Sequence, residues 1–277
     1  MSEREYVLGT HDEEIARLGL QHRVWQSEMF ACWGKSMEAL QQFGKPGERL
    51  RVLDVGSGPG YATRDLAEAF GPPNEVIGLE RSERFVQNAK ERCADKINVF
   101  FRELDLMEDD LGLDGVDLAW CRWVLCFLPD PALVLRKLAK AMKPGAVFAI
   151  HDYCDYRSWR PAPRRPLIEE FVSETMASWV DTGGDPDVAL RLPTLLHEAG
   201  FEVVHTRPIV RTFDPGDEGW KWPEAYILNH AKRLIELRGK SSEWADAVVA
   251  ELREAEKDPH SLMITPMVLE IVAVRVE

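Results

Sequence analysis

From residue 50 onward, short apolar runs alternate with longer amphipathic segments. The apolar runs predict buried strands, and the amphipathic segments between them predict helices. The expected strands are Arg51–Val55, Val76–Glu80, Ile97–Arg102, Val116–Cys121 and Ala146–His151. The expected helices between them are Tyr61–Phe70, Ser82–Cys93 and Pro131–Met142. This alternation predicts an α/β fold in which a parallel sheet carries helices on both faces.

Residues 1–49 are expected to form an N-terminal helical cap. Thr10-His11-Asp12-Glu13 has the spacing of a capping box, and apolar positions then recur at helical intervals as far as Trp25. A second helical stretch runs from Met29 to Phe43, and the turn rich in Gly and Pro after it ends the cap.

The alternation of strands and helices breaks after residue 152. A loop rich in Pro and Arg leads into helices expected at Leu167–Val180 and Pro186–Ala199, and strands are expected at Phe201–Thr206 and Met263–Val276. We therefore expect residues 50–277 to form one domain with helical lid insertions at about 153–185 and 207–260. The lids are rich in aromatic residues, namely Tyr153, Tyr156, Trp159, Trp220, Trp222 and Tyr226.

Composition and charge narrow the classes of partner. The chain of 277 residues has a net charge of -13, which disfavours a nucleic-acid substrate, and the cluster Arg157–Arg165 is interpreted as a solvated loop. No apolar run is long enough to span a bilayer, and no secretory leader is expected. The five cysteines are scattered without a C-x-x-C pair, which indicates a cytoplasmic protein.

A glycine-rich loop follows the first strand. The run Gly56-Ser57-Gly58-Pro59-Gly60 lets the backbone turn sharply and approach a ligand closely. A dinucleotide-binding loop would need Gly or Ala at position 61, where this chain has Tyr61. Asp54, two residues before the loop, would repel a pyrophosphate but suits a cationic ligand such as an aminoacyl sulfonium.

Acidic residues also follow the second and third strands. Glu80 can accept hydrogen bonds from both hydroxyls of a ribose, and we assign Arg81 beside it to the same site. Asp105, followed by Leu106, stands where a carboxylate could hold an adenine amino group.

These motifs, in this order over residues 50–152, resemble those of the class I S-adenosylmethionine-dependent methyltransferases. The resemblance implies a doubly wound, mostly parallel, seven-stranded Rossmann-like sheet, with S-adenosyl-L-methionine as the cofactor. It implies that the backbone of Cys121 and Arg122, in the segment Cys121–Pro131, borders the methionine part of the cofactor. The preamble is similar to that of a bacterial subset that acts on small molecules, which implies cofactor contacts from Tyr6 and Gln21.

The expected function is methyl transfer to a small, apolar or aromatic acceptor at an oxygen, nitrogen or carbon atom. His151 ends the fifth strand and is the candidate general base, with simple pocket lining or a structural hydrogen bond as its alternatives. Tyr153 is a second candidate. No metal is assigned, although His151, Asp152 and Asp155 offer ligand atoms. The other functions left open are cofactor binding without methylation and a nicotinamide-dependent oxidoreductase. A homodimer is compatible with the sequence.

Overall fold

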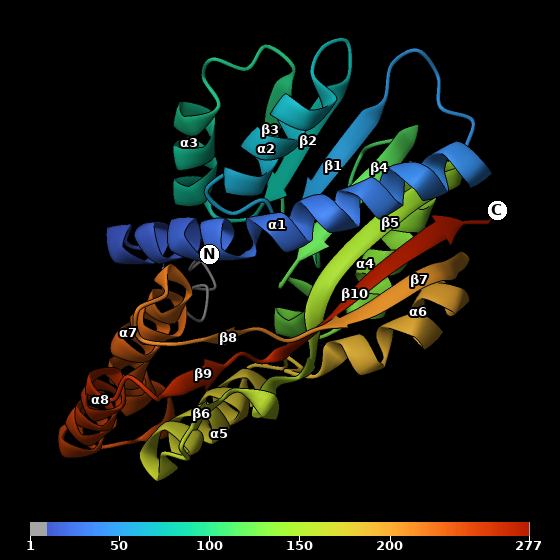
Figure 1. Ribbon diagram of the computed structural model, residues 1–277. Coiled ribbons are helices and arrows are strands. Elements are labelled where there is room, and N and C mark those ends of the chain that lie inside the picture. Colours follow the sequence, from blue (N-terminus) through green and yellow to red (C-terminus); the bar gives the residue numbers. More distant parts are fainter. Residues whose placement is uncertain (1–9, 277) are drawn as a thin grey trace.

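The computed structural model describes residues 10–276, and a seven-stranded sheet forms the centre of the larger of its two lobes (Figure 1). Its strands are β1 (Arg51–Val55), β2 (Glu75–Glu80), β3 (Val99–Glu103), β4 (Val116–Arg122), β5 (Met142–Asp155), β7 (Phe201–Ile209) and β10 (Met267–Arg275). They lie in the order β3-β2-β1-β4-β5-β10-β7. Strand β10 runs antiparallel to both of its neighbours, β5 and β7, and the other neighbouring pairs are parallel. The mostly parallel, seven-stranded sheet expected from the sequence is confirmed.

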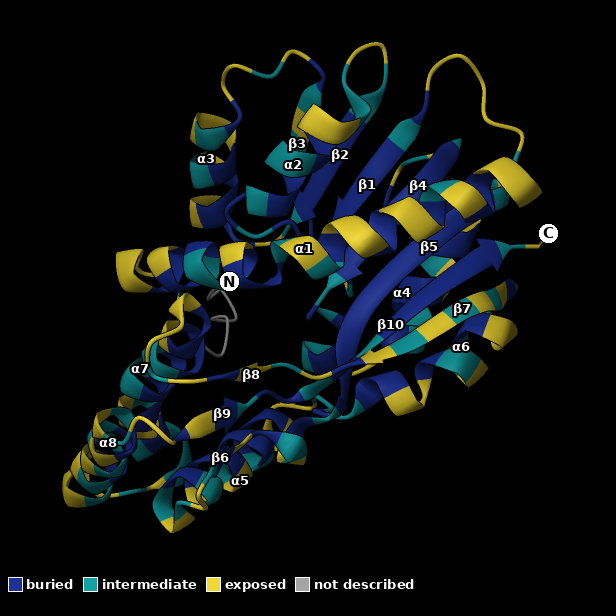
Figure 2. Ribbon diagram, viewed as in Figure 1, coloured by how far each residue is buried: buried dark blue, intermediate teal, exposed yellow. Residues whose placement is uncertain are grey.

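Helices cover both faces of this sheet. They are α1 (Asp12–Phe43), α2 (Tyr61–Phe70), α3 (Glu83–Arg92), α4 (Pro131–Ala141) and α6 (Leu192–Glu198). Successive strand residues point to opposite faces, so Val52 packs in the cluster formed with α1 and α2, whereas Leu53 packs in the cluster formed with α4 and α6. The inner strands are buried along most of their length, whereas the edge strands β3 and β7 are partly exposed (Figure 2).

Helix α1 is a single element where the sequence analysis expected two stretches. No proline interrupts it, and buried positions recur from Ile15 to Leu40, so the same helix packs along its whole length. The residue that caps it is His11 and not Thr10, because Nδ1 of His11 accepts a hydrogen bond from the backbone N–H of Glu14. Despite the length of α1, none of the described helices is apolar enough to cross a membrane.

The smaller lobe, the lid unit, is built from both insertions. It contains α5 (Pro166–Asp181), α7 (Lys221–Arg238), α8 (Ser242–Lys257), β6 (Arg160–Ala162), β8 (Thr212–Phe213) and β9 (Leu262–Ile264). Strand β9 pairs antiparallel with both β6 and β8, so chain segments about one hundred residues apart form one three-stranded sheet. Residues near the start of α1 lie against α7 (Figure 1).

Two expected elements were wrong in extent because of prolines. The strand expected over Met263–Val276 is divided into β9 and β10 at Thr265-Pro266, since Pro266 has no N–H to donate. The helix expected over Pro186–Ala199 is a 3-10 turn, Val188–Leu190, followed by α6, which has Pro193 in its first turn.

Candidate active site

A cavity of about 760 Å³ lies at the carboxyl ends of β1, β2 and β4, between the sheet, α1 and the lid unit. In open α/β sheets this edge is where ligands bind. The cavity has two halves. The glycine-loop half is lined by Asp54, Gly56, Ser57, Gly58, Glu80 and Asp105. The aromatic half is lined by Trp123, Tyr153, Tyr156, Trp159, Trp179, Trp222 and Tyr226.

The glycine loop is held against the end of β2. The backbone N–H groups of Gly56 and Ser57 donate to the carbonyl of Leu79, at 2.8 and 2.9 Å. Gly56 has φ +70, and an added Cβ would lie 2.4 Å from Val124, so a side chain is excluded there. At Gly58, φ +54, an added Cβ would meet no protein atom within 4 Å. The loop therefore leaves an open cradle beside Gly58.

Two acids border this cradle. The Glu80 carboxylate accepts hydrogen bonds from the backbone N–H groups of Gly58 at 2.9 Å and Ser82 at 2.8 Å, and burial raises its pKa. Asp105 accepts from the N–H of Met107 at 2.8 Å, and its carboxylate lies 3.8 Å from the Arg81 guanidinium. Both acids keep acceptor capacity for a ligand in the cavity.

Asp54 lies beneath the loop, on β1. Its carboxylate accepts a hydrogen bond of 2.6 Å from the hydroxyl of Thr63. Burial raises the pKa of Asp54 to about 6. A cationic group placed in the cavity would favour the ionised form.

The aromatic half is a set of rings that pack on one another. Trp123 stacks on Tyr153 and Trp222, with centroids 5.6 and 6.0 Å apart, and Tyr156 meets Tyr153 edge-on at 4.8 Å. Burial raises the pKa of both Tyr153 and Tyr156 well above 10, so both phenols are neutral at physiological pH. Such a surface suits an apolar or aromatic molecule.

The cavity brings together most of the residues that the sequence analysis assigned to the cofactor. Those that line it are Asp54, Gly56, Ser57, Gly58, Glu80, Arg81, Asp105, Leu106, Arg122 and Gln21. Gly60 and Cys121 do not line it, because Gly60 packs against Ala89 and Cys121 is fully buried in the sheet. Tyr6 lies outside the described residues.

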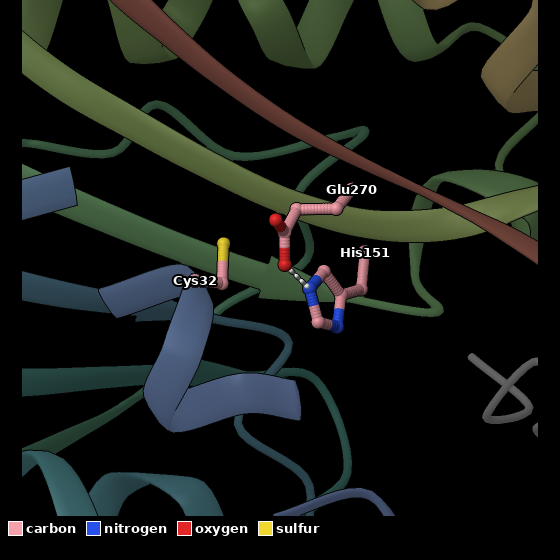
Figure 3. Close-up of side chains that lie close together, drawn as sticks. All are labelled: Cys32, His151 and Glu270. Atoms are coloured by element: carbon pink, nitrogen blue, oxygen red, sulfur yellow. Dashed lines mark hydrogen bonds and ion pairs between the residues drawn. The ribbon is translucent and has the colours of Figure 1, made fainter. Parts of the chain in front are cut away.

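His151 does not line the cavity, so the structure gives no support to its use as a general base. Its side chain is fully buried on the face of the sheet that α1 covers, and its ring packs edge-on against Trp120 at 4.9 Å. Nε2 of His151 lies 3.0 Å from the Glu270 carboxylate (Figure 3), and burial lowers the pKa of the imidazole. The alternative of pocket lining fails for the same reason, and a structural hydrogen bond remains. Tyr153, the second candidate, does line the aromatic half.

Glu270 is the acceptor at the centre of this buried group. Its carboxylate takes hydrogen bonds from His151, His205 and Arg207, at 3.0 to 3.1 Å. Burial alone would raise the pKa of Glu270, but these partners outweigh it and lower the pKa to about 2. Cys32, His151 and Glu270 bring possible metal ligands within 4.8 Å of one another (Figure 3). Since the Arg207 cation already contacts both carboxylate oxygens, we assign no metal there.

Several lining residues were not predicted from the sequence. They include Arg17 and Leu18 on α1, Phe85 on α3, and Trp179 on α5. Lys137 was also missed. Its ammonium donates to the carbonyls of Leu106, Met107 and Asp109, at 2.6 to 2.9 Å, and so fixes the loop that carries Asp105. Nothing in the local sequence marks a lysine on an amphipathic helix for this contact.

A family model described as a methyltransferase domain matches residues 46–186, just over half of the chain. The chain belongs to the methyltransferase domain family. The chain is 30% identical over 162 residues to the 2-phytyl-1,4-naphtoquinone methyltransferase of Synechococcus elongatus, a match that covers 57% of this chain and 62% of the relative. It is 31% identical over 153 residues to the trans-aconitate 2-methyltransferase of Variovorax paradoxus, covering 55% and 54%. The chain thus spans about half to three-fifths of these curated relatives.

Solved structures share the fold of most of the chain. A putative sarcosine dimethylglycine methyltransferase from Galdieria sulphuraria has a TM-score of 0.54 at 16% identity, covering 82% of this chain and 78% of that one. A putative methyltransferase from Bacillus halodurans has a TM-score of 0.54 at 17% identity, covering 88% and 100%. At this identity the likeness concerns the fold alone.

Replacing His151 should affect stability. His151→Ala removes a buried ring and a hydrogen bond to Glu270, so the free energy of unfolding should fall by about 2–4 kcal/mol. Urea denaturation at pH 7 measures this loss. His205→Ala is the matched control, because His205 contacts the same carboxylate from a side chain that is 31% exposed. The free energy of unfolding should fall less in this variant than in His151→Ala. Equal losses in the two variants would contradict this account.

Proposed function

We propose that the protein transfers a methyl group from S-adenosyl-L-methionine to a small, apolar or aromatic acceptor. The observation that carries the proposal is the continuity of the cavity, in which the glycine-loop half opens directly into the aromatic half. One half fits a nucleoside with an amino-acid tail, and the other fits an apolar molecule. A volume of about 760 Å³ is large enough for both ligands together.

The glycine-loop half offers a partner for each part of the cofactor. We assign the ribose hydroxyls to Glu80, the adenine to Asp105 and Leu106, and the methionine ammonium to Asp54. The cradle beside Gly58 admits ligand atoms where a side chain would stand. When bound, the cofactor supplies an electrophilic methyl group on a sulfonium.

The aromatic half is the proposed acceptor site. Its rings surround the acceptor with apolar surface and limit its contact with water. The relatives named for a naphthoquinone and for trans-aconitate support a small-molecule acceptor. Tyr153 is proposed to position the acceptor by a hydrogen bond from its neutral phenol. The acceptor atom is left unassigned.

Binding and turnover test the proposal together. Calorimetry should show binding of S-adenosylhomocysteine, and Glu80→Gln should weaken it by roughly 10- to 100-fold, because one charged hydrogen-bond acceptor is lost. Glu83→Gln, on the exposed side of α3, is the matched control and should bind as the unaltered protein does. Release of S-adenosylhomocysteine with naphthols, quinols and small carboxylic acids then tests methylation. Binding without release for any acceptor would favour a protein that binds the cofactor without methylating.

Binding should depend on pH through Asp54. The pKa of Asp54 is raised to about 6 by burial, and a bound ammonium favours the ionised carboxylate. Affinity for S-adenosylhomocysteine should therefore be constant above pH 7 and fall as the pH drops through 6, approaching tenfold per unit. Calorimetry between pH 5 and 8 measures this, with Asp54→Asn as the control that removes the dependence. A flat profile in the unaltered protein would count against the ammonium contact.

Tyr153 should matter for the acceptor and not for the cofactor. Tyr153→Phe keeps the ring that stacks on Trp123 but removes the hydroxyl. For an acceptor found in the panel above, kcat/KM should fall about 3- to 10-fold, the size of one neutral hydrogen bond. S-adenosylhomocysteine affinity should not change. A parallel loss of cofactor affinity would show that Tyr153 acts elsewhere.

A further inference from the structure

The loop of residues 104–109, which follows β3 and contributes to the lining of the glycine-loop half, is held from outside by one ammonium group. The ammonium belongs to Lys137, which is half-buried on α4, and it donates to three carbonyls of the 104–109 loop. These are the carbonyls of Leu106 and Met107, at 2.9 Å, and of Asp109, at 2.6 Å. An ammonium has three N–H donors, so the loop engages all of them.

The charge of Lys137 is what allows these carbonyls to converge. Each carbonyl oxygen is the negative end of a peptide dipole, so three of them directed at one point repel one another. A cation at that point turns the repulsion into attraction, and a charged donor makes stronger hydrogen bonds than a neutral one. The conformation of the 104–109 loop therefore depends on the ammonium of Lys137.

One peptide group connects this ammonium to the carboxylate of Asp105. Its carbonyl, which belongs to Leu106, accepts from Lys137 at 2.9 Å. Its N–H, which belongs to Met107, donates to Oδ1 of Asp105 at 2.8 Å. The peptide unit is planar, so the direction of the carbonyl fixes the direction of the N–H. Hydrogen bonds in such a chain also polarise one another, so the ammonium strengthens the contact that holds the carboxylate.

The second carboxylate oxygen of Asp105 keeps acceptor capacity for a ligand. Oδ2 lies 3.8 Å from the Arg81 guanidinium, which is longer than a hydrogen bond, and the side chain of Asp105 is 27% exposed in the lining of the cavity. A carboxylate oxygen accepts hydrogen bonds and donates none. The amino group at C6 of adenine is a donor and matches it, whereas the carbonyl at C6 of a 6-oxopurine is an acceptor and does not.

We infer that Lys137 is a positioning residue for base selection: by fixing the 104–109 loop, its ammonium sets the Asp105 carboxylate where it distinguishes a 6-aminopurine from a 6-oxopurine. The inference rests on the proposed use of S-adenosyl-L-methionine and goes beyond the contact proposed between Asp105 and adenine. Lys137 is not among the described residues that line the cavity, so its effect on a ligand passes through the loop.

A pair of ligands isolates the base. Calorimetry at pH 7.5 would compare S-adenosylhomocysteine with S-inosylhomocysteine, in which a carbonyl replaces the amino group at C6 of the purine. The unaltered protein should prefer S-adenosylhomocysteine by about 10- to 100-fold. In Lys137→Met the preference should fall to about threefold or less, because the Asp105 carboxylate loses its fixed position. Lys137→Arg, which keeps a charged donor, should retain part of the preference.

Chemical rescue separates the role of the ammonium from any general effect on folding. Lys137→Ala removes three methylene groups and the ammonium, and n-propylammonium has the same number of carbon and nitrogen atoms as the part removed. Added n-propylammonium chloride should therefore restore part of the preference for S-adenosylhomocysteine in Lys137→Ala. Tetramethylammonium chloride at the same concentration has no N–H donor and should not restore it.

Arg102→Met is the matched control. The Arg102 guanidinium donates to the carbonyls of Leu111 and Gly112, at 3.3 and 3.2 Å, beyond the part of the loop that lines the cavity, so its loss should leave the preference unchanged. A preference that survives in a folded Lys137→Met, an equal weakening of both ligands in that variant, or equal binding of both by the unaltered protein would overturn the inference. Binding of neither ligand by the unaltered protein would instead refute the proposed function.

Discussion

The edge-on contact between Trp33 of α1 and Trp120 of β4, with ring centroids 5.8 Å apart, lies within the interface that joins α1 to the sheet. Met29 and Cys32 are fully buried in the same interface. This packing fixes the C-terminal part of α1, and the N-terminal part then reaches past the sheet to the lid unit, where Gln21 accepts from the indole of Trp222 at 2.9 Å. The size of the cavity therefore depends on how α1 packs on the sheet.

The end of β4 shows how the two halves of the cavity are joined. Consecutive residues of a strand normally point to opposite faces, yet Arg122 and Trp123 both line the cavity. Trp123 has φ +53, a left-handed conformation that costs a bulky residue on the order of 1–2 kcal/mol. Its stacking on Tyr153 and Trp222 offsets that cost. The strained residue thus places a charged group and an aromatic platform side by side.

The local sequence was sufficient to predict most of the residues that line the glycine-loop half of the cavity. The first strand, the loop and Glu80 follow one another within thirty residues, and a parallel sheet necessarily brings their carboxyl ends to one edge. The prediction that His151 is a general base found no support, because the environment of His151 depends on α1 and on Glu270, which are distant in sequence. The pairing of β9 with β6 and β8 was likewise out of reach, since no periodicity indicates which short strands meet. The tight packing of α1 against α2 at Gly19, where a Cβ would lie 2.6 Å from Tyr61, has no local signal either.

The chemistry of the aromatic half limits the acceptors that the proposed function can use. His151 is buried away from the cavity, and the raised pKa values of Tyr153 and Tyr156, which line the aromatic half, make them poor proton acceptors at neutral pH. The carboxylates of the cavity lie in the glycine-loop half, where the cofactor is proposed to engage them. The aromatic half therefore suits an acceptor that has lost its proton before it enters or has none to lose. That requirement favours ionised phenols, enols and carboxylic acids over alcohols.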